Sequence, residues 1–114
     1  MKQLLAAMLL IATPLAFAQK KSGSLKVYFA DVEGGQATLF VPPSGENLLV
    51  DAGWPGAENA DKLTKLCQLA GVKKIDNLVI THYHRDHVGG VPELAAKIPV
   101  VRFIDHGVNR ETDN

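Results

Sequence analysis

The hydrophobic pattern along the chain predicts an α/β fold that begins with strands. Apolar and β-branched residues alternate over residues 25–29 and return over residues 37–41, with a glycine-containing break between them, which is typical of a β-hairpin. A short apolar run, residues 48–50, follows the turn "PPSGEN" and is expected to form a buried strand. Because the chain reverses direction twice, the third strand should run parallel to the first.

The pattern then changes to a helical period. Apolar residues recur at i, i+3, i+4 and i+7, namely Leu63, Leu66, Cys67 and Ala70. This stripe predicts a helix that Gly71 can end at its C′ position. Residues 78–80 and 100–104 indicate two more strands, and Pro92 favours a helix between them that continues to residue 96. Strand–helix–strand crossovers should make the last three strands parallel.

This order of elements gathers polar residues at one edge of the sheet. The three parallel strands end at Asp51, at His82 and at Asp105-His106, and ligands of open α/β sheets bind outside such ends. The turn over residues 31–36 should reach the same edge. Candidates for substrate contact or for walling a site there, with ordinary turn, surface or core roles as the alternative, are Glu33, Trp54, Asp105 and Arg110.

Length, charge and cysteine content narrow the classes of function. The 114 residues leave room for one domain. Twelve basic residues balance twelve acidic ones, so we expect no basic surface for nucleic acid and no membrane-binding surface. Cys67 is the single cysteine and cannot form an intrachain disulfide. Its helical neighbours indicate a core thiol, with a nucleophile as the alternative.

The beginning of the chain predicts export. Lys2 gives a positive start, residues 4–12 are apolar, and Ala16-Phe17-Ala18 has the small-x-small form of a signal-peptidase site. We therefore expect a signal peptide over residues 1–18, a polar tether over residues 19–24 and a domain over residues 25–114. An uncleaved anchor is the alternative, although the apolar run is short for a membrane span. The mature protein is expected to be periplasmic or secreted. Its mass would show whether residues 1–18 have been removed.

Three of the four histidines lie in the stretch "THYHRDHVGG". A single loop histidine is usually solvated, but His82 and His84 are two apart at a strand end, so both can point to one side. Imidazole is a common zinc ligand. Asp86 and His87 follow where the chain should turn, and can face a second position, because two-metal hydrolases hold their ions about 3.5–4 Å apart. The following Gly-Gly would let the backbone pass close to the metals.

The pattern His82-x-His84-x-Asp86-His87, between an apolar strand and Gly-Gly, resembles the signature of the metallo-β-lactamase superfamily. The stretch "VYFADVEGGQATLFVPPSGENLLVDAGW" is similar to the opening strands of that superfamily, especially the branch that contains the hydrolase-like domain of DNA-uptake competence proteins. The resemblance covers residues 25–107. It implies an αββα sandwich of which this chain holds the first half, a mixed sheet with two helices, and hence an apparently truncated domain.

The resemblance also implies the metals and their ligands. Two zinc ions are expected, with Mn²⁺ or Fe²⁺ as other divalent metals. The implied ligands are His82 and His84 for the first ion, and Asp86 and His87 for the second. Asp86 would also orient the attacking water, and Asp51 matches an aspartate that supports the ligands rather than binding metal. The family's remaining ligands come from its second half; His106 is a conceivable substitute, with an ordinary loop residue as the alternative.

The function implied by the resemblance is a zinc-dependent hydrolase. Metal-activated water would attack an ester, amide, lactone or phosphodiester, and the sequence does not select among these substrates. The alternative is a non-catalytic metal-binding or interaction protein that retains the metal loop, which a stable monomer with weak zinc affinity would support. Phosphate or nucleic-acid binding at the helix after Gly90 is a third hypothesis. Half a sandwich would leave one sheet face apolar, so we expect a homo-oligomer or a separate second half.

Overall fold

The computed structural model describes residues 23–110. In chain order, its elements are β1 (Lys26–Phe29), β2 (Thr38–Val41), β3 (Leu48–Val50), α1 (Ala57–Leu69), β4 (Asn77–Val79), α2 (Arg85–Val88), α3 (Val91–Ala95) and β5 (Phe103–Ile104). The predicted signal peptide and most of the predicted tether lie outside the described residues and stay predictions. Within residues 23–110, no helix is both long enough and apolar enough to cross a membrane.

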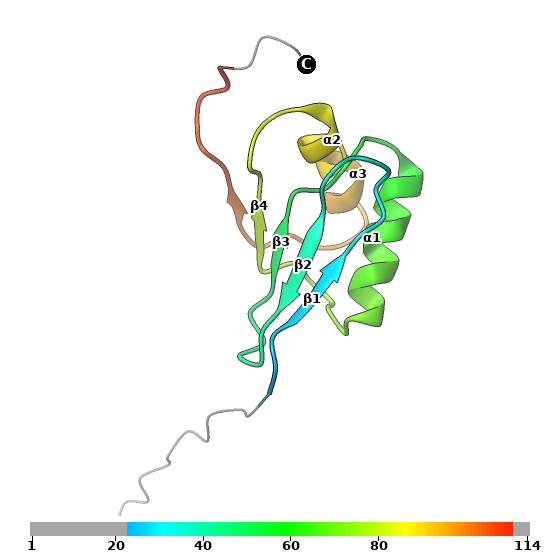
Figure 1. Ribbon diagram of the computed structural model, residues 1–114, viewed down its shortest axis with the longest axis vertical. Helices are drawn as coiled ribbons and strands as arrows, with labels where there is room; N and C mark the ends of the chain where they lie inside the picture. The colour runs from blue at the N-terminus through cyan, green and yellow to red at the C-terminus, as the bar shows by residue number, and fades with distance from the viewer. Residues whose placement is uncertain (1–22, 111–114) are drawn as a thin grey trace, which may run out of the picture.

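The five strands form one mixed sheet in the order β1-β2-β3-β4-β5 (Figure 1). β2 is antiparallel to β1 and to β3, whereas β3, β4 and β5 run parallel, so the predicted hairpin and crossovers are confirmed. The last strand is shorter than expected. Its pairing begins with an isolated bridge between Val100 and Ile75 and becomes regular only at Phe103, because this edge strand has a neighbour on one side only.

Helix α1 buries one stripe and ends as the sequence predicts. Ala60, Leu63 and Cys67 point into the core, at the spacing of one helix face. Gly71 has a φ of 74°, which a residue without Cβ adopts at little cost. Its N–H donates to the Gln68 carbonyl, and the next N–H donates to the Cys67 carbonyl. These two bonds form a Schellman motif that satisfies the last carbonyls of the helix.

The histidine stretch contains a helix that the sequence did not predict. Residues 85–88 form the single turn α2, in which the N–H groups of His87 and Val88 donate to the carbonyl of His84. The sequence predicted only that the chain turns here, because one short helical turn leaves no hydrophobic period in the sequence. The predicted second helix is α3, which begins at Val91 with Pro92 in its first turn.

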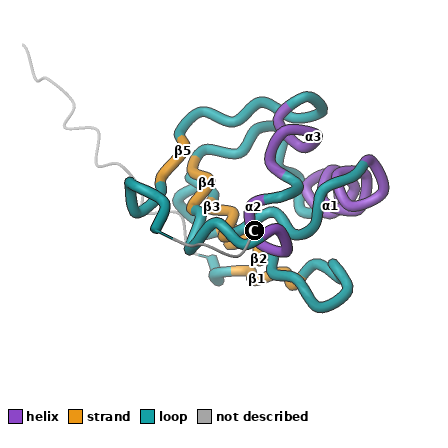
Figure 2. The backbone as a smooth tube through the Cα atoms, turned by 90° about the horizontal axis from the view of Figure 1, so that it is seen from above, coloured by secondary structure: helices purple, strands orange, loops and turns teal. Residues whose placement is uncertain are grey.

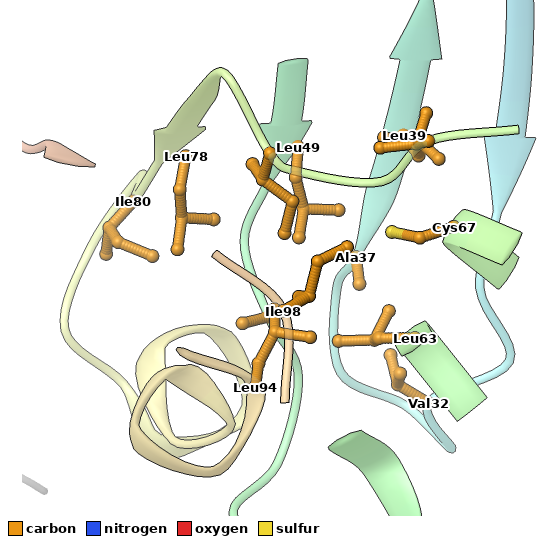
Figure 3. Close-up of a cluster of buried hydrophobic side chains, with 13 residues drawn as sticks. Val32, Ala37, Leu39, Leu49, Leu63, Cys67, Leu78, Ile80, Leu94 and Ile98 are labelled. Carbon is orange, nitrogen blue, oxygen red and sulfur yellow. The ribbon is translucent and has the colours of Figure 1, made fainter. Parts of the chain in front are cut away.

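The core lies between the sheet and helices α1 and α3 (Figure 3). Leu39, Leu49 and Leu78 are partners on neighbouring strands and at most 1% exposed. Each such side chain contributes about 1.5–3 kcal/mol when fully buried. Cys67 packs here too, and burial raises the pKa of its thiol to about 11. The thiol therefore stays protonated at neutral pH, as expected for a core residue rather than a nucleophile.

The opposite face of the sheet carries no helix in the part of the chain that the structure describes (Figure 2). Strand register places a set of apolar side chains on this face, namely Val27, Phe29, Phe40, Val50, Val79 and Ile104. Phe29 is 79% exposed, and Val27 and Ile104 are each 40% exposed. The half-sandwich architecture expected from the sequence is thus present, with its second apolar face open.

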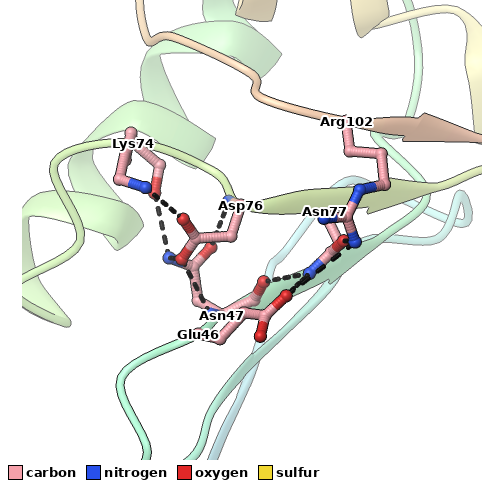
Figure 4. A network of polar contacts seen from close by, with 6 residues as sticks. All are labelled: Glu46, Asn47, Lys74, Asp76, Asn77 and Arg102. Carbon is pink, nitrogen blue, oxygen red and sulfur yellow. Dashed lines mark hydrogen bonds and ion pairs between the residues drawn. The ribbon is translucent and has the colours of Figure 1, made fainter.

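A polar network joins the turn between β2 and β3 to the start of β4 (Figure 4). Asn47 is 4% exposed, and its amide donates to the Lys74 carbonyl and to Asp76. The Asp76 N–H donates back to the Asn47 side chain at 3.1 Å. A hydrogen bond from Lys74, together with the Asn47 backbone N–H, holds the pKa of Asp76 below its usual range. This network fixes the entry of β4, the strand that leads into the histidines.

Replacing Asp76 by asparagine is expected to lower the free energy of unfolding by about 1–2 kcal/mol at pH 7. Because the folded-state pKa of Asp76 is depressed, its contribution is present above about pH 4 and is lost as the pH falls through the folded value. Urea unfolding at several pH values should therefore show the two proteins converging in acid. Asp61→Asn is the control, since its exposed pair with Lys97 should change stability by less than about 0.5 kcal/mol. A difference that stays constant with pH would contradict the prediction.

Candidate metal centre

The loops after β1, β3 and β4 meet at one end of the sheet, the upper end in Figure 1, as predicted from the topology. Backbone hydrogen bonds join them. Gln36 donates to the Asp86 carbonyl at 3.0 Å, and Ala52 donates to the His87 carbonyl at 2.7 Å. Gly90 and Gly53 are joined in the same way, at 3.0 Å. The histidine stretch is therefore held by main-chain bonds to two other loops.

Glycines allow these loops to approach so closely. A Cβ on Gly35 would lie 2.4 Å from the Asp86 carbonyl oxygen. A Cβ on Gly90 would lie 2.1 Å from the Ala52 carbonyl oxygen, and one on Gly89 would meet Pro55 at 2.4 Å. The Gly-Gly pair thus lets the histidine stretch pass close to the turn after β3, against its backbone and its proline.

Asp51 is a fully buried carboxylate at the centre of this edge. Its side chain is 0% exposed, and its φ of 60° is a conformation that aspartate tolerates better than most residues. One carboxylate oxygen accepts the Thr81 N–H at 2.8 Å. The other accepts the Thr81 hydroxyl at 2.7 Å and contacts His87 Nδ1 at 2.8 Å. The carboxylate thus orients the histidine stretch from inside the fold, the place expected for a supporting group.

The first two histidines face each other. His82 Nε2 and His84 Nδ1 are 3.1 Å apart, and the rings are roughly perpendicular, with centroids 4.6 Å apart. Two nitrogens bound at about 2.0–2.1 Å to one tetrahedral zinc ion would lie about 3.4 Å apart. The two nitrogens are therefore spaced as two ligands of one ion.

The other two motif residues form a second pair on α2. His87 Nε2 and an oxygen of Asp86 are 3.5 Å apart, and the two side chains are 21% and 27% exposed. The His87 ring lies close to His82, with centroids 3.9 Å apart. The structure therefore brings all four predicted ligands together. In each pair, a nitrogen or oxygen atom of one side chain faces a nitrogen of the other.

This arrangement fits part of a metal shell. Zinc in catalytic sites has three protein ligands, and in structural sites it has four. Within residues 23–110, no group of three or more His, Cys, Asp or Glu side chains is placed to hold one ion. The described residues thus offer two pairs of candidate ligand atoms.

Two of the predicted rim residues lie beside the site on the α1 side. The Glu33 carboxylate pairs with Lys62 of α1 at 3.3 Å, and Trp54 Nε1 donates to the Glu33 carbonyl at 3.2 Å. Together they line an open hollow of about 350 Å³ with the start of α1. Trp54 is 40% exposed, so it walls this hollow instead of capping the core.

The predicted residues after β5 lie against the middle of the histidine stretch. Tyr83 donates its hydroxyl to the Gly107 carbonyl at 2.7 Å, and the His106 ring lies 4.7 Å from the Tyr83 ring. The Asp105 carboxylate accepts the Gly107 N–H at 2.8 Å, as in an ordinary turn. Arg110 is exposed at the end of the described chain. His106 therefore contacts the tyrosine between the two facing histidines.

Sequence reasoning missed Thr81. This residue contacts the Asp51 carboxylate, and its hydroxyl oxygen lies 3.0 Å from His82 Nδ1. Its sequence signal is slight, a single hydroxyl residue between an apolar strand and the first histidine.

Fold and site together define a class of protein. The profile of the Metallo-beta-lactamase superfamily matches residues 30–112, which include every motif residue. The chain belongs to the metallo-beta-lactamase superfamily, and the predicted fold class is confirmed. The chain is similar in structure to a HARLDQ-motif mutant of a metallo-beta-lactamase from Cronobacter sakazakii, with a TM-score of 0.55 and 25% identity. This likeness covers 68% of this chain and 30% of that one.

Two curated relatives add detail. A Hydroxyacylglutathione hydrolase from Stenotrophomonas maltophilia (strain R551-3) is 52% identical over 31 residues, 27% of this chain and 12% of the relative. An Atrochrysone carboxyl ACP thioesterase from Cryptosporiopsis sp. (strain 8999) is 35% identical over 65 residues, 57% of this chain and 20% of the relative. The chain thus spans a fifth or less of the length of these relatives. Its relation to the competence-protein branch stays a prediction.

Proposed function

We propose that this chain carries the metal-binding motif of a zinc-dependent hydrolase. The observation that carries the proposal is the pair of facing nitrogens, His82 Nε2 and His84 Nδ1, 3.1 Å apart, beside the pair formed by Asp86 and His87. The resemblance implies two zinc ions, one at each pair. Because residues 23–110 hold two candidate ligand atoms for each ion, we propose that further ligands come from a second copy or from another part of the protein.

The residues of the chain have separate tasks in this proposal. A bound zinc ion would activate water and stabilise negative charge on the substrate. Asp51 holds His87 through Nδ1, so that Nε2 is left to bind. Asp86 is partly exposed next to His87, where its carboxylate can bind metal and accept a hydrogen bond from a water. Glu33 and Trp54 line a hollow beside the candidate metal centre, and this hollow offers room for part of a substrate.

Acyl thioesters are the first substrate class to test. The names of the two relatives refer to hydrolysis of an acylglutathione and of an acyl group carried by ACP, both of which are thioesters. Water attack at a thioester carbonyl develops charge on oxygen, which a metal can stabilise. Other esters, amides, lactones and phosphodiesters are the next classes, since the fold alone does not select among them.

The alternative function is a metal-binding or interaction protein without catalysis. The observation in its favour is that no described group of three ligands forms within one chain. The two hypotheses also differ in the partner they require, because the open apolar face with Phe29 at its edge should be covered in an active protein. We propose a second copy of the chain or a second half of the fold as this cover.

The test is to measure zinc per chain by elemental analysis after dialysis, together with the mass in solution. For a hydrolase site completed by self-association, we expect about two zinc ions per chain on an oligomer, followed by thioester turnover. His84→Ala should lose about one of these ions, whereas His106→Ala, the matched control outside the motif, should keep both. Weak, easily removed zinc on a stable monomer without turnover would instead favour the non-catalytic alternative. Equal zinc in the wild type and in His84→Ala would refute the site.

A further inference from the structure

Thr81 lies between the buried carboxylate and the first histidine, and no motif assigns it a task. Its backbone N–H and its hydroxyl both contact Asp51, at 2.8 Å and 2.7 Å. The same hydroxyl oxygen lies 3.0 Å from His82 Nδ1. Asp51 contacts His87 directly, at 2.8 Å. Thr81 is therefore placed to connect Asp51 with His82.

The direction of these hydrogen bonds follows from counting protons. A hydroxyl has one proton to donate, and the Thr81 hydroxyl donates it to the Asp51 carboxylate at 2.7 Å. If the Thr81 hydroxyl gave its proton to His82, two oxygens 2.7 Å apart would face each other with no proton between them. The Thr81 proton therefore goes to Asp51, and the hydroxyl lone pair accepts from His82. His82 must then carry its proton on Nδ1, so that the lone pair of Nε2 can accept from His84 Nδ1, 3.1 Å away, or bind a metal.

We propose that Thr81 is a positioning residue that transmits the orientation set by Asp51 to His82 and fixes the tautomer of that ring. The buried Asp51 carboxylate then orients one histidine of each pair. It contacts His87 directly and acts on His82 through the Thr81 hydroxyl. In both rings Nδ1 carries the proton, and Nε2 is free to bind. The inference rests on the proposed function only in that zinc is the partner of these free nitrogens.

The first test needs no zinc. Nitrogen NMR of the ¹⁵N-labelled, metal-free chain at about pH 8, where a free imidazole is neutral, shows which ring nitrogen carries the proton. In the wild type, we expect the proton on Nδ1 in His82 and in His87. Thr81→Val keeps the shape but removes the hydroxyl, so His82 should shift toward the Nε2–H tautomer while His87 keeps its proton on Nδ1. Thr81→Ser restores a hydroxyl and should restore the wild-type pattern of His82.

The second test measures zinc affinity by competition with a chromophoric chelator. Loss of a group that orients a metal ligand typically weakens affinity about 10–100-fold. We expect this loss in Thr81→Val and near wild-type affinity in Thr81→Ser, with urea unfolding of each variant to separate binding from stability. A wild-type chain that does not bind zinc would defeat the proposed function but leave the tautomer test decisive. A proton on Nε2 of His82 in the wild type, or an unchanged zinc affinity in Thr81→Val, would overturn the role of Thr81.

Discussion

Replacing Asp51 by alanine is expected to cost about 3–5 kcal/mol of folding free energy and to abolish zinc retention. The carboxylate is 0% exposed and accepts from the Thr81 N–H, the Thr81 hydroxyl and His87. Its removal takes the acceptor away from all three donors, and a hydrogen bond to a charged group contributes about 1.5–3 kcal/mol. Alanine is also strained at the φ of 60° that residue 51 adopts.

Two further variants separate the causes. Asp51→Asn tolerates the same φ and keeps an accepting oxygen, but it lacks the charge and introduces an N–H₂ group, so we expect an intermediate loss in urea unfolding and a fall in zinc affinity of about 10–100-fold. Asp31→Ala removes an exposed carboxylate from the neighbouring loop and should change stability by less than about 0.5 kcal/mol. If Asp51→Ala were as stable as Asp31→Ala, the supporting role assigned to Asp51 would be wrong.

Replacing Gly90 by alanine is expected to destabilise the protein by about 3 kcal/mol or more, because the added methyl group has no space. Its Cβ would lie 2.1 Å from the Ala52 carbonyl oxygen and 3.0 Å from the Trp54 carbonyl oxygen. Both contacts are with backbone, which cannot rotate away as a side chain does. Relief requires the histidine stretch and the turn after β3 to separate, which would break the 3.0 Å bond between Gly90 and Gly53.

The measurement for Gly90 is urea unfolding, with circular dichroism to confirm that the variant folds. Gly45→Ala is the matched control, because Gly45 has a φ of 92° but no atom within 4 Å of an added Cβ. We expect this control to lose only about 1 kcal/mol, the cost of backbone strain without a clash. Comparable losses in the two variants would show that steric exclusion at Gly90 is not the cause.

Much of the fold could be predicted because it depends on local sequence. The period-2 pattern in β1 and β2 predicts their hairpin, and the stripe that ends at Gly71 predicts α1 with its Schellman motif. The crossover rule then places β3, β4 and β5 parallel, which brings their carboxyl ends to one edge. The one-turn helix α2 was not predictable, because four residues contain no measurable period.

The sequence by itself determined the class of protein and the residues of the motif, since His82, His84, Asp86 and His87 lie within one short stretch. The tertiary structure decided how they are held. Asp51 contacts Thr81 and His87 across 30 and 36 residues of chain, and in our proposal these contacts select which ring nitrogens can bind a metal. The structure also placed His106 against Tyr83 rather than beside a ligand pair. The distances from Asp51 to Thr81 and His87 depend on how β3 and β4 pair in the sheet, and no local sequence pattern encodes this pairing.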